Sequence, residues 1–537
     1  MKIPGLARST RWLGALTIGF AMTLAARAAA PAGETPGRLD YIDEMLRAGW
    51  EGAKIAPSKP ADDAEFVRRA YLDFLGRIPT AQEASVFLEN KDKDKRIKLV
   101  EYLLADPDYP KNFANQWTVI LIGRGRQERE VNRPALTSWL RRQFGENRPW
   151  NEMARELITA KGSNKDNGAT NFTLAHMENG AVPITSLTTR VFLGQQIQCT
   201  QCHDHPSNDW KQEQFWAINA FYKGVKRRTI KGVDASGKEV DDHTDLYDEP
   251  ADGYAKFERR NGELRIAYPA YLDGRKISPS PDVVRRDELG KFITAEDNIE
   301  FPQAFVNRMW FHFMGRGIVH PVDDFGPHNP PSHPELLERL GADFAAYGYD
   351  VKALIRWITS SQAYHLTSVA TPQNEKDEAL FSHMALKPMN PEQLFDSLLV
   401  ATAAHKTGSG DDMDRKRDQW LRQFVFTFGN DEGEENTSFQ GTIPQALMMM
   451  NGELMNNATG PKAGTFIAQT IEEAQRQRRS PEQFALNRIY LAALSRLPSR
   501  DETARLSKMS AGYPDTAMFL RDVFWALLNS NEFVLNH

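Results

Sequence analysis

The chain has 537 residues, 41% of them hydrophobic and 26% charged, and its 66 basic and 71 acidic residues leave a net charge of −5. This is the composition of a water-soluble protein, and it excludes a polytopic membrane protein and a low-complexity chain. Two cysteines are too few to cross-link a disulfide-rich scaffold of this size. Because the charges nearly balance, no chain-wide field attracts nucleic acid, and we expect no nucleic-acid partner.

The N-terminal segment has the layout of a secretory signal peptide. Basic residues precede an apolar stretch from Trp12 to Ala26, and three alanines follow before Pro31. About 15 apolar residues are too few to span a bilayer comfortably. We therefore predict a signal peptide over residues 1–30, a periplasmic or otherwise exported protein, and no membrane span after cleavage. An uncleaved N-terminal anchor is the alternative.

The rest of the chain predicts a mainly α fold. From residue 35 to 222, apolar side chains recur at helical spacings of three and four, and prolines divide the pattern into short helices. Turn signals then appear, and 255–267 alternates around Asn261-Gly262 like a β-hairpin. The helical pattern later returns. We expect two multi-helical domains, 35–222 and 284–537, with a small β-hairpin insertion at 223–283 between them.

One helical pattern occurs twice. Residues 69–79 and 488–498 share the spacing Arg-x-Tyr-Leu-x-x-Leu-x-Arg, followed by an apolar residue and a proline. Thr80 and Ser499 come next, each three residues before a glutamate, which is the spacing of a capping box. We interpret the echo as a repeated helical hairpin rather than as a shared binding site.

The most specific motif contains both cysteines of the chain. Cys199, Cys202 and His203 form Cys-Thr-Gln-Cys-His, which is the spacing of c-type haem attachment. Two thiols three residues apart can form thioethers to the vinyl groups of one porphyrin, while the adjacent imidazole of His203 reaches the haem iron. An exported protein suits this chemistry. The motif therefore predicts a haem c site.

Two alternatives to haem stay open for this motif. The second histidine of the run, His205, allows a non-haem site in which Cys199, Cys202, His203 and His205 hold zinc or another transition metal. Alternatively, the two thiols close as a short disulfide, since an exported protein meets an oxidising compartment.

At this point the sequence resembles a known family. Leu187-Thr-Thr-Arg190-Val-Phe-Leu-Gly-Gln-Gln-Ile-Gln-Cys199, continuing to Pro206, is similar to the central signature of the planctomycete cytochrome C family. The run Phe305-Val-Asn-Arg-Met-Trp310 and the segment 321–336 resemble the domain of unknown function that habitually follows it. The similarity extends from about Tyr41 to the end. The family name implies a cytochrome, but no established reaction comes with it.

A second polar cluster occupies a proline-rich segment. It contains Asp323, Asp324, His328, Asn329 and His333. Two carboxylates and two imidazoles could act as an acid/base pair or bind a metal, so Asp323, Asp324 and His333 are candidate catalytic residues.

The same segment can be accounted for by loop architecture alone. In that case Ser332 and Glu335 form a capping box for a helix that begins near Pro334.

Two further segments carry weaker signals, an acidic run and a run of methionines. The acidic run from Asp241 to Asp245 could bind a cation, although exposed acidic loops are usually solvated. Met448–Met450 lies in a helical pattern, and we expect core packing there rather than an axial ligand.

The sequence thus predicts an exported c-type haem-binding protein for electron transfer or redox chemistry in the periplasm, acting on a redox partner or an extracytoplasmic substrate. The alternatives are a non-haem metalloenzyme that uses the Cys-x-x-Cys-His-x-His cluster, and a non-catalytic extracytoplasmic scaffold with a Cys-x-x-Cys disulfide.

Overall fold

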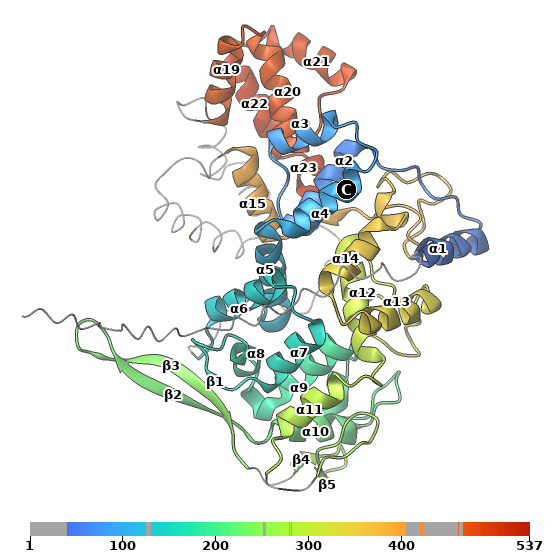
Figure 1. Cartoon of the computed structure of the whole chain (residues 1–537), viewed down its shortest axis with the longest axis vertical. Coiled ribbons are helices and arrows are strands. Elements are labelled where there is room, and N and C mark those ends of the chain that lie inside the picture. The colour runs from blue at the N-terminus through green and yellow to red at the C-terminus, as the bar shows by residue number, and fades with distance from the viewer. Residues whose placement is uncertain are drawn as a thin grey trace, which may run out of the picture. The chain divides into compact units, whose positions relative to one another are not determined.

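The structure is a computed structural model that describes residues 40–124, 130–250, 254–278, 280, 282–403, 419, 422, 460 and 465–537 (Figure 1). The predicted signal peptide and Met448–Met450 lie outside the described residues. Residues 40–537 form one compact unit.

Helices account for most of the N-terminal part. Its α-helices are α1 (Asp40–Ala53), α2 (Asp63–Leu75), α3 (Ala81–Glu89), α4 (Lys95–Ala105), α5 (Asp108–Ile122), α6 (Arg133–Gly145), α7 (Trp150–Thr159), α8 (Thr170–Leu174), α9 (Glu178–Leu193) and α10 (Gln212–Asn219). Two 3-10 turns accompany them, η1 (Gln198–Gln201) and η2 (Ala220–Tyr222).

Helices also dominate the described C-terminal part. They are α11 (Arg285–Ile293), α12 (Glu300–Met314), α13 (Pro334–Ala346), α14 (Val351–Ser360), the 3-10 turn η3 (Ala363–His365), α15 (Pro391–Ala401), α19 (Phe466–Arg476), α20 (Pro481–Leu494), α21 (Arg500–Ser510), α22 (Thr516–Leu528) and α23 (Asn531–Val534). Among the described residues, none of the helices combines the length and apolar character needed to cross a bilayer.

The sheets are small. Their strands are β1 (Gly162–Ser163), β2 (Val225–Val233), β3 (Glu239–Asp248), β4 (Ala255–Glu258), β5 (Leu264–Ala267), β6 (Lys387–Pro388) and β7 (Leu535–Asn536). All pairings are antiparallel, in the order β1-β3-β2, β4-β5 and β6-β7. The fold is therefore mainly α with small β elements, as the sequence predicted. The hairpin expected over 255–267 is confirmed as β4 and β5, in which Ala255 pairs with Ala267.

The repeated hairpin is also confirmed, and its two copies are α2–α3 and α20–α21. In the first copy Thr80 and Glu83 form the capping box, and in the second Ser499 and Glu502 form it. Arg77 hydrogen bonds to Glu83 and lies over the ring of Tyr71. Arg496 repeats both contacts, with Glu502 and Tyr490.

The two copies pack against each other. Ala81 and Ala84 of α3 form a buried cluster with Leu491 and Ala492 of α20. The side chain of Arg68 in α2 is fully buried and donates to the carbonyl of Ala493 at 2.9 Å. The repeated sequence pattern therefore forms two hairpins that pack together, although about 420 residues of chain separate them.

Buried polar groups also tie α2 to the C-terminal segments. Asp73, at 1% exposure, accepts hydrogen bonds from Lys387 Nζ at 2.6 Å, Asn536 Nδ2 at 2.7 Å and Tyr364 Oη at 3.0 Å. Because β6 contains Lys387 and β7 contains Asn536, one carboxylate from α2 holds both strands of this pair. A buried carboxylate needs such partners, since an unpaired charge in the interior is costly.

Candidate functional site

The Cys-x-x-Cys-His motif lies in the connection between α9 and α10. The helix α9 ends at Gly194, which adopts a left-handed φ of 67°, and the chain then makes the short turn η1. Thr200 is fully buried and its hydroxyl donates to the carbonyl of Ile197 at 2.6 Å. Cys199 and Cys202 flank this inward-facing threonine, and both are exposed free thiols.

Side chains of α10 hold the motif in place. Trp216 Nε1 and Gln212 Nε2 both donate to the carbonyl of Gln201, at 3.1 and 3.2 Å. The backbone N–H of Gln212 donates to Asp204 Oδ1 at 3.0 Å. These bonds fix the backbone on either side of Cys202 and His203, so the thiols stand on a preorganised turn.

The hydrogen bonds of His203 define which ring nitrogen is available. Its Nδ1 lies 2.6 Å from the carbonyl oxygen of Asp204. A carbonyl oxygen can only accept, so Nδ1 carries a proton, and in the neutral ring Nε2 keeps its lone pair. This is the arrangement that a histidine ligand of a metal or haem iron requires.

His205 differs from His203. The backbone N–H of Ser207 donates to His205 Nδ1 at 3.3 Å, so in the neutral ring the proton sits on Nε2. Burial, followed by the nearby His328 imidazole, lowers the pKa of His205, and His203 acts in the same direction. The two histidines of the motif therefore present opposite ring nitrogens.

The proline-rich loop faces this motif. The rings of His205 and His328 lie 6.1 Å apart between centroids, and His328 Nε2 donates to Asp324 Oδ1 at 3.0 Å. The backbone N–H of Phe325 donates to the carbonyl of Gly194 at 2.9 Å, which holds the loop against the end of α9. Asp324 therefore joins the motif through His328, whose role sequence reasoning did not single out.

Asp323 is committed to structural ion pairs. Its carboxylate pairs with Arg308 of α12, and its Oδ2 lies 3.7 Å from Arg190 Nε of α9. Both arginines belong to the motifs that carry the family resemblance. These contacts hold α9 and α12 together and leave Asp323 poorly suited to acid/base work.

His333 lies elsewhere. It is buried at 6% exposure, its ring is 5.7 Å from that of Phe381, and a Cβ added to Gly49 of α1 would come within 2.7 Å of its Nε2. Burial lowers the pKa of His333. The described contacts place it against α1, so of the three candidate catalytic residues only Asp324 joins the motif.

The capping box expected at Ser332 and Glu335 is wrong. The N-cap residue of α13 is His333, with φ −134° and ψ 78°, and it makes no side-chain cap. The residue before a proline is disfavoured in the helical region, so His333 cannot serve as the first helical residue. The helix begins at Pro334, as the sequence predicted, so only the predicted cap is wrong.

Sequence reasoning also missed the hydrogen-bond chain behind the motif. Trp210 Nε1 donates to Gln195 Oε1 at 3.1 Å, and Gln195 Nε2 donates to Glu300 Oε1 at 3.3 Å. Burial raises the pKa of Glu300. The backbone N–H of His205 donates to the carbonyl of Trp210 at 2.8 Å, so this chain anchors the histidine loop to α12. No local signal marks such a chain, because its members come from three segments.

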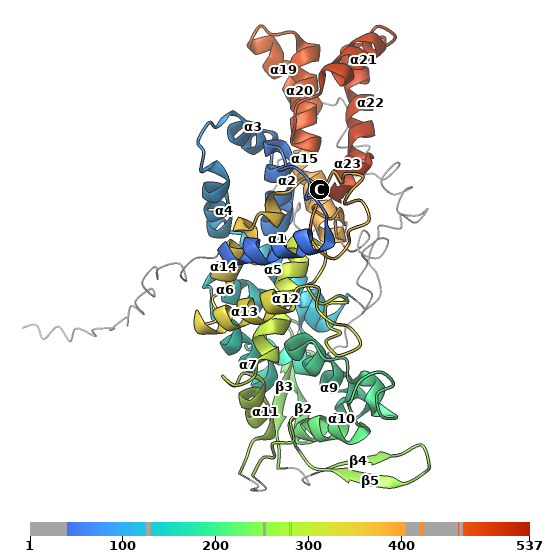
Figure 2. The same cartoon turned by 90° about the vertical axis from the view of Figure 1, so that its right-hand side faces the viewer.

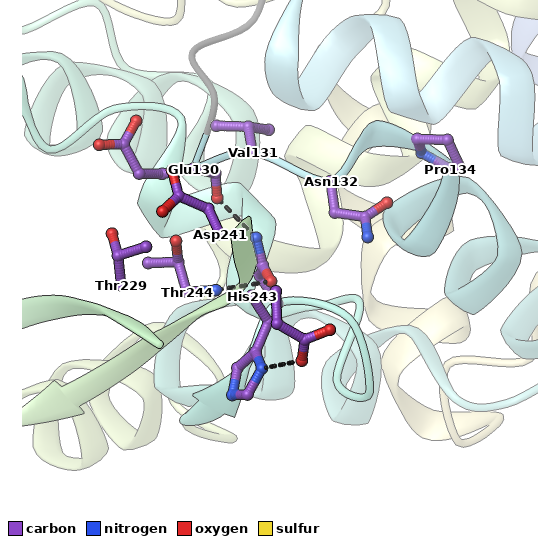
Figure 3. Close-up of a pocket in the computed structure, with 10 residues that line it drawn as sticks. Glu130, Val131, Asn132, Pro134, Thr229, Asp241, His243 and Thr244 are labelled. Atoms are coloured by element: carbon purple, nitrogen blue, oxygen red, sulfur yellow. Dashed lines mark hydrogen bonds and ion pairs between the residues drawn. The ribbon is translucent and has the colours of Figure 1, made fainter. Parts of the chain in front are cut away.

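The acidic run in β3 is largely paired. It lines a polar cavity of about 310 Å³ together with residues near the start of α6 (Figure 3). Asp242 pairs with Lys165 at 3.0 Å and accepts a hydrogen bond from His243 Nδ1 at 2.7 Å. Asp241 pairs with Lys231, and Asp245 pairs with Arg228 at 3.2 Å. These ion pairs account for the acidic side chains. Across all described residues, no three His, Cys, Asp or Glu side chains converge as a metal-binding group.

Two family models match the chain. Residues 41–227 match PSCyt2, a protein of unknown function (DUF1549), and residues 285–437 match PSD1, a protein of unknown function (DUF1553). No curated protein and no solved structure matches the chain significantly. The first match contains the cysteine motif, and the second contains the loop with Asp324 and His328. Two segments of the chain are thus similar to two families of unknown function, DUF1549 over residues 41–227 and DUF1553 over residues 285–437.

Proposed function

We propose that the turn from Cys199 to His203 is a covalent attachment site for haem c, and that the exported protein serves electron transfer or redox chemistry in the periplasm. One observation supports this most directly. Two exposed free thiols flank a buried threonine, and the adjacent His203 keeps the lone pair of Nε2 while Nδ1 donates to a backbone carbonyl.

The residues fit the group. Each thiol S–H of Cys199 and Cys202 would add across one vinyl group of the porphyrin, and His203 Nε2 would face the iron. When bound, haem supplies a one-electron Fe(III)/Fe(II) couple. The part of the protein is to hold the turn: Trp216 and Gln212 fix its backbone through the carbonyl of Gln201, so the thiols and the imidazole need little rearrangement.

A non-haem site is the second candidate, in which Cys199, Cys202, His203 and His205 hold zinc or another transition metal. The contact of His205 with His328, which in turn bonds to Asp324, favours it. Two observations stand against it. In the neutral ring His205 Nε2 carries the proton, and these four side chains do not converge as a metal-binding group in the described structure.

Intact mass and absorption spectra of the exported protein test the proposal. The full chain is produced in a host with c-type haem maturation, alongside a Cys199→Ser/Cys202→Ser double variant and a His328→Ala control. We expect the wild type and the His328→Ala control to gain the mass of one haem with a Soret band, and the double variant to gain neither.

The His205→Ala variant separates the candidates. Haem attachment should survive this change, since His205 is not part of the attachment motif, whereas a metal held by all four side chains should be lost from elemental analysis. A colourless wild type with stoichiometric metal would contradict the haem proposal and support the second candidate. A colourless, metal-free protein whose mass is two hydrogens below that calculated for the chain with both thiols reduced would instead identify the disulfide of a scaffold.

A further inference from the structure

The hairpin β4–β5 carries an exposed apolar stripe. Leu264 is 77% exposed, Ile266 48% and Tyr268 62%. Alternate residues of a strand share one face of a sheet, so Leu264 and Ile266 of β5 lie on one face, and Tyr268 follows directly after the end of the strand. On the opposite face Phe257 is buried and stacks on Trp216 of α10. One face of the hairpin thus packs on α10, whereas the face with Leu264 and Ile266, where Lys256 and Glu258 are their neighbours across the strands, has no partner within the described structure (Figure 2).

The hairpin also carries an excess of basic side chains. By the strand register, Lys256 lies opposite Ile266 on the face of the stripe, whereas Arg265 lies opposite Phe257 on the other face. From residue 254 to 268 the chain has four basic and two acidic residues, against a net charge of −5 for the whole. The basic ones are Lys256, Arg259, Arg260 and Arg265, all exposed. Glu263 pairs with Arg265 at 2.7 Å and lies 4.0 Å from Arg259, and the other acid is Glu258. The patch is therefore locally positive.

The aromatic side chains at the end of the hairpin add a further feature. Tyr254 and Tyr268 meet edge to face with ring centroids 6.2 Å apart, and Lys256 Nζ lies 5.6 Å from the ring centroid of Tyr254. Tyrosine is favoured at the boundary between lipid and water, because one end of its ring is apolar and the other polar. The stripe thus ends in residues suited to that boundary.

The size of the surface argues against a stable protein complex. At these exposures, the three side chains, of about 150–250 Å² or less each, can bury only on the order of 400 Å², whereas a standard protein interface needs about 800 Å² from each partner. Shallow insertion into a lipid surface needs no such area, since apolar burial and attraction between basic residues and anionic headgroups act together.

We propose that the β4–β5 hairpin docks on an anionic phospholipid surface, with Leu264, Ile266 and Tyr268 inserted at the headgroup boundary and the arginines against lipid phosphates. The protein would then associate peripherally with a membrane that none of its described helices crosses. The inference does not depend on haem attachment, because none of these residues belongs to the cysteine motif, so each proposal can fail alone.

Co-sedimentation with vesicles tests the proposal. The purified full chain is mixed with vesicles of equal parts phosphatidylglycerol and phosphatidylcholine, or of phosphatidylcholine alone. We expect binding to the anionic vesicles that weakens with added salt. The Leu264→Ser/Ile266→Ser/Tyr268→Ser variant should bind at least about tenfold more weakly, because it loses the apolar insertion.

Matched control variants test whether binding depends on this hairpin in particular. Val233→Ser changes a comparably exposed apolar residue of β2, 71% exposed, and should bind as the wild type does. All variants share one N-terminus, verified by intact mass, so its apolar stretch contributes equally to each. Arg259→Gln/Arg260→Gln changes no apolar side chain and should weaken binding by about tenfold while flattening the salt dependence.

Three results would overturn the inference. The first is a wild type that does not bind anionic vesicles at low salt, and the second is equal binding by the serine triple variant. The third is a dimer in sedimentation velocity without lipid that becomes a monomer in the triple variant, which would make the stripe an interface between two copies. Unchanged circular dichroism confirms that each variant is folded.

Discussion

Gly194 connects three parts of the candidate site: the end of α9, the turn that carries the cysteine motif, and the proline-rich loop. Its left-handed φ of 67° lets the chain leave α9 and begin the turn that carries Cys199. Its carbonyl accepts a hydrogen bond from the N–H of Phe325 in the proline-rich loop. A Cβ here would lie 2.3 Å from the ring of Phe325. Glycine is therefore needed twice, for the backbone conformation and for the close approach of the loop.

A Gly194→Ala variant should be destabilised by about 2–4 kcal/mol, which combines the cost of a left-handed alanine with that of overpacking against Phe325. Gly237→Ala is the matched control. Its φ is 83°, and no atom lies within 4 Å of an added Cβ, so it should cost only about 1 kcal/mol. Urea denaturation measures both, and equal losses would show that the contact with Phe325 is unimportant.

At the scale of elements, the repeated hairpin shows how one short pattern builds the same unit twice. In each copy a helix ends, and an arginine that follows it donates hydrogen bonds to a glutamate six residues later. The same glutamate accepts the N-cap backbone N–H of the next helix. The glutamate therefore serves three donors at once. Because the two hairpins pack on each other through α3 and α20, the stability of one contributes to that of the other.

The capping glutamate gives a pH-dependent prediction. The hydrogen bonds from Arg496 lower the pKa of Glu502 to about 2, from an ordinary value of 4.5. A lowered folded-state pKa contributes stability above the unfolded-state value, and this contribution disappears as the pH falls from 4.5 towards 2. Glu502→Gln should therefore lower stability at pH 7 by up to about 1 kcal/mol, since the pair is partly exposed, and by progressively less below pH 4.5.

Thermal melting of both proteins from pH 7 to pH 3.5 measures this difference. Asp501→Asn, which removes the same charge from the same helical turn, is the control for the loss of one negative charge. A Glu502→Gln difference that stays constant with pH would mean that the carboxylate charge plays no part.

At the scale of the whole molecule, Asp73 joins segments that are far apart in the chain. Its bonds to Tyr364, Lys387 and Asn536 span 291, 314 and 463 residues, and residues 40–537 form one compact unit. A carboxylate shared by three segments couples their unfolding, because losing any one of them leaves a buried charge with fewer partners.

An Asp73→Asn variant should lose about 3–5 kcal/mol, since it breaks a buried ion pair while keeping the shape of the side chain. Calorimetry of both proteins should give a single main transition, shifted to lower temperature in the variant. Glu101→Gln removes an exposed ion pair with Arg356 and should cost at most about 1 kcal/mol. Separate transitions, of which only one responds to Asp73→Asn, would show that the segments unfold independently.

The local features of this protein could be predicted from its sequence. The hairpin around Asn261-Gly262 and the capping boxes at Thr80 and Ser499 follow from neighbours a few residues apart, which interact whatever the rest of the chain does. The exception is also local: the residue before Pro334, His333, takes the N-cap position of α13 in place of Ser332. Backbone preferences of this kind act within a few residues.

Only the tertiary structure decided which polar residues belong together. The ring of His205 lies beside that of His328, from a distant part of the chain. Asp323 forms ion pairs with Arg308 and Arg190. His333 lies against α1. The sequence determined the helical class and the motif with two thiols and an imidazole. It could not determine these contacts, because they depend on how α9 and α12 pack, and packing is a property of the assembled core.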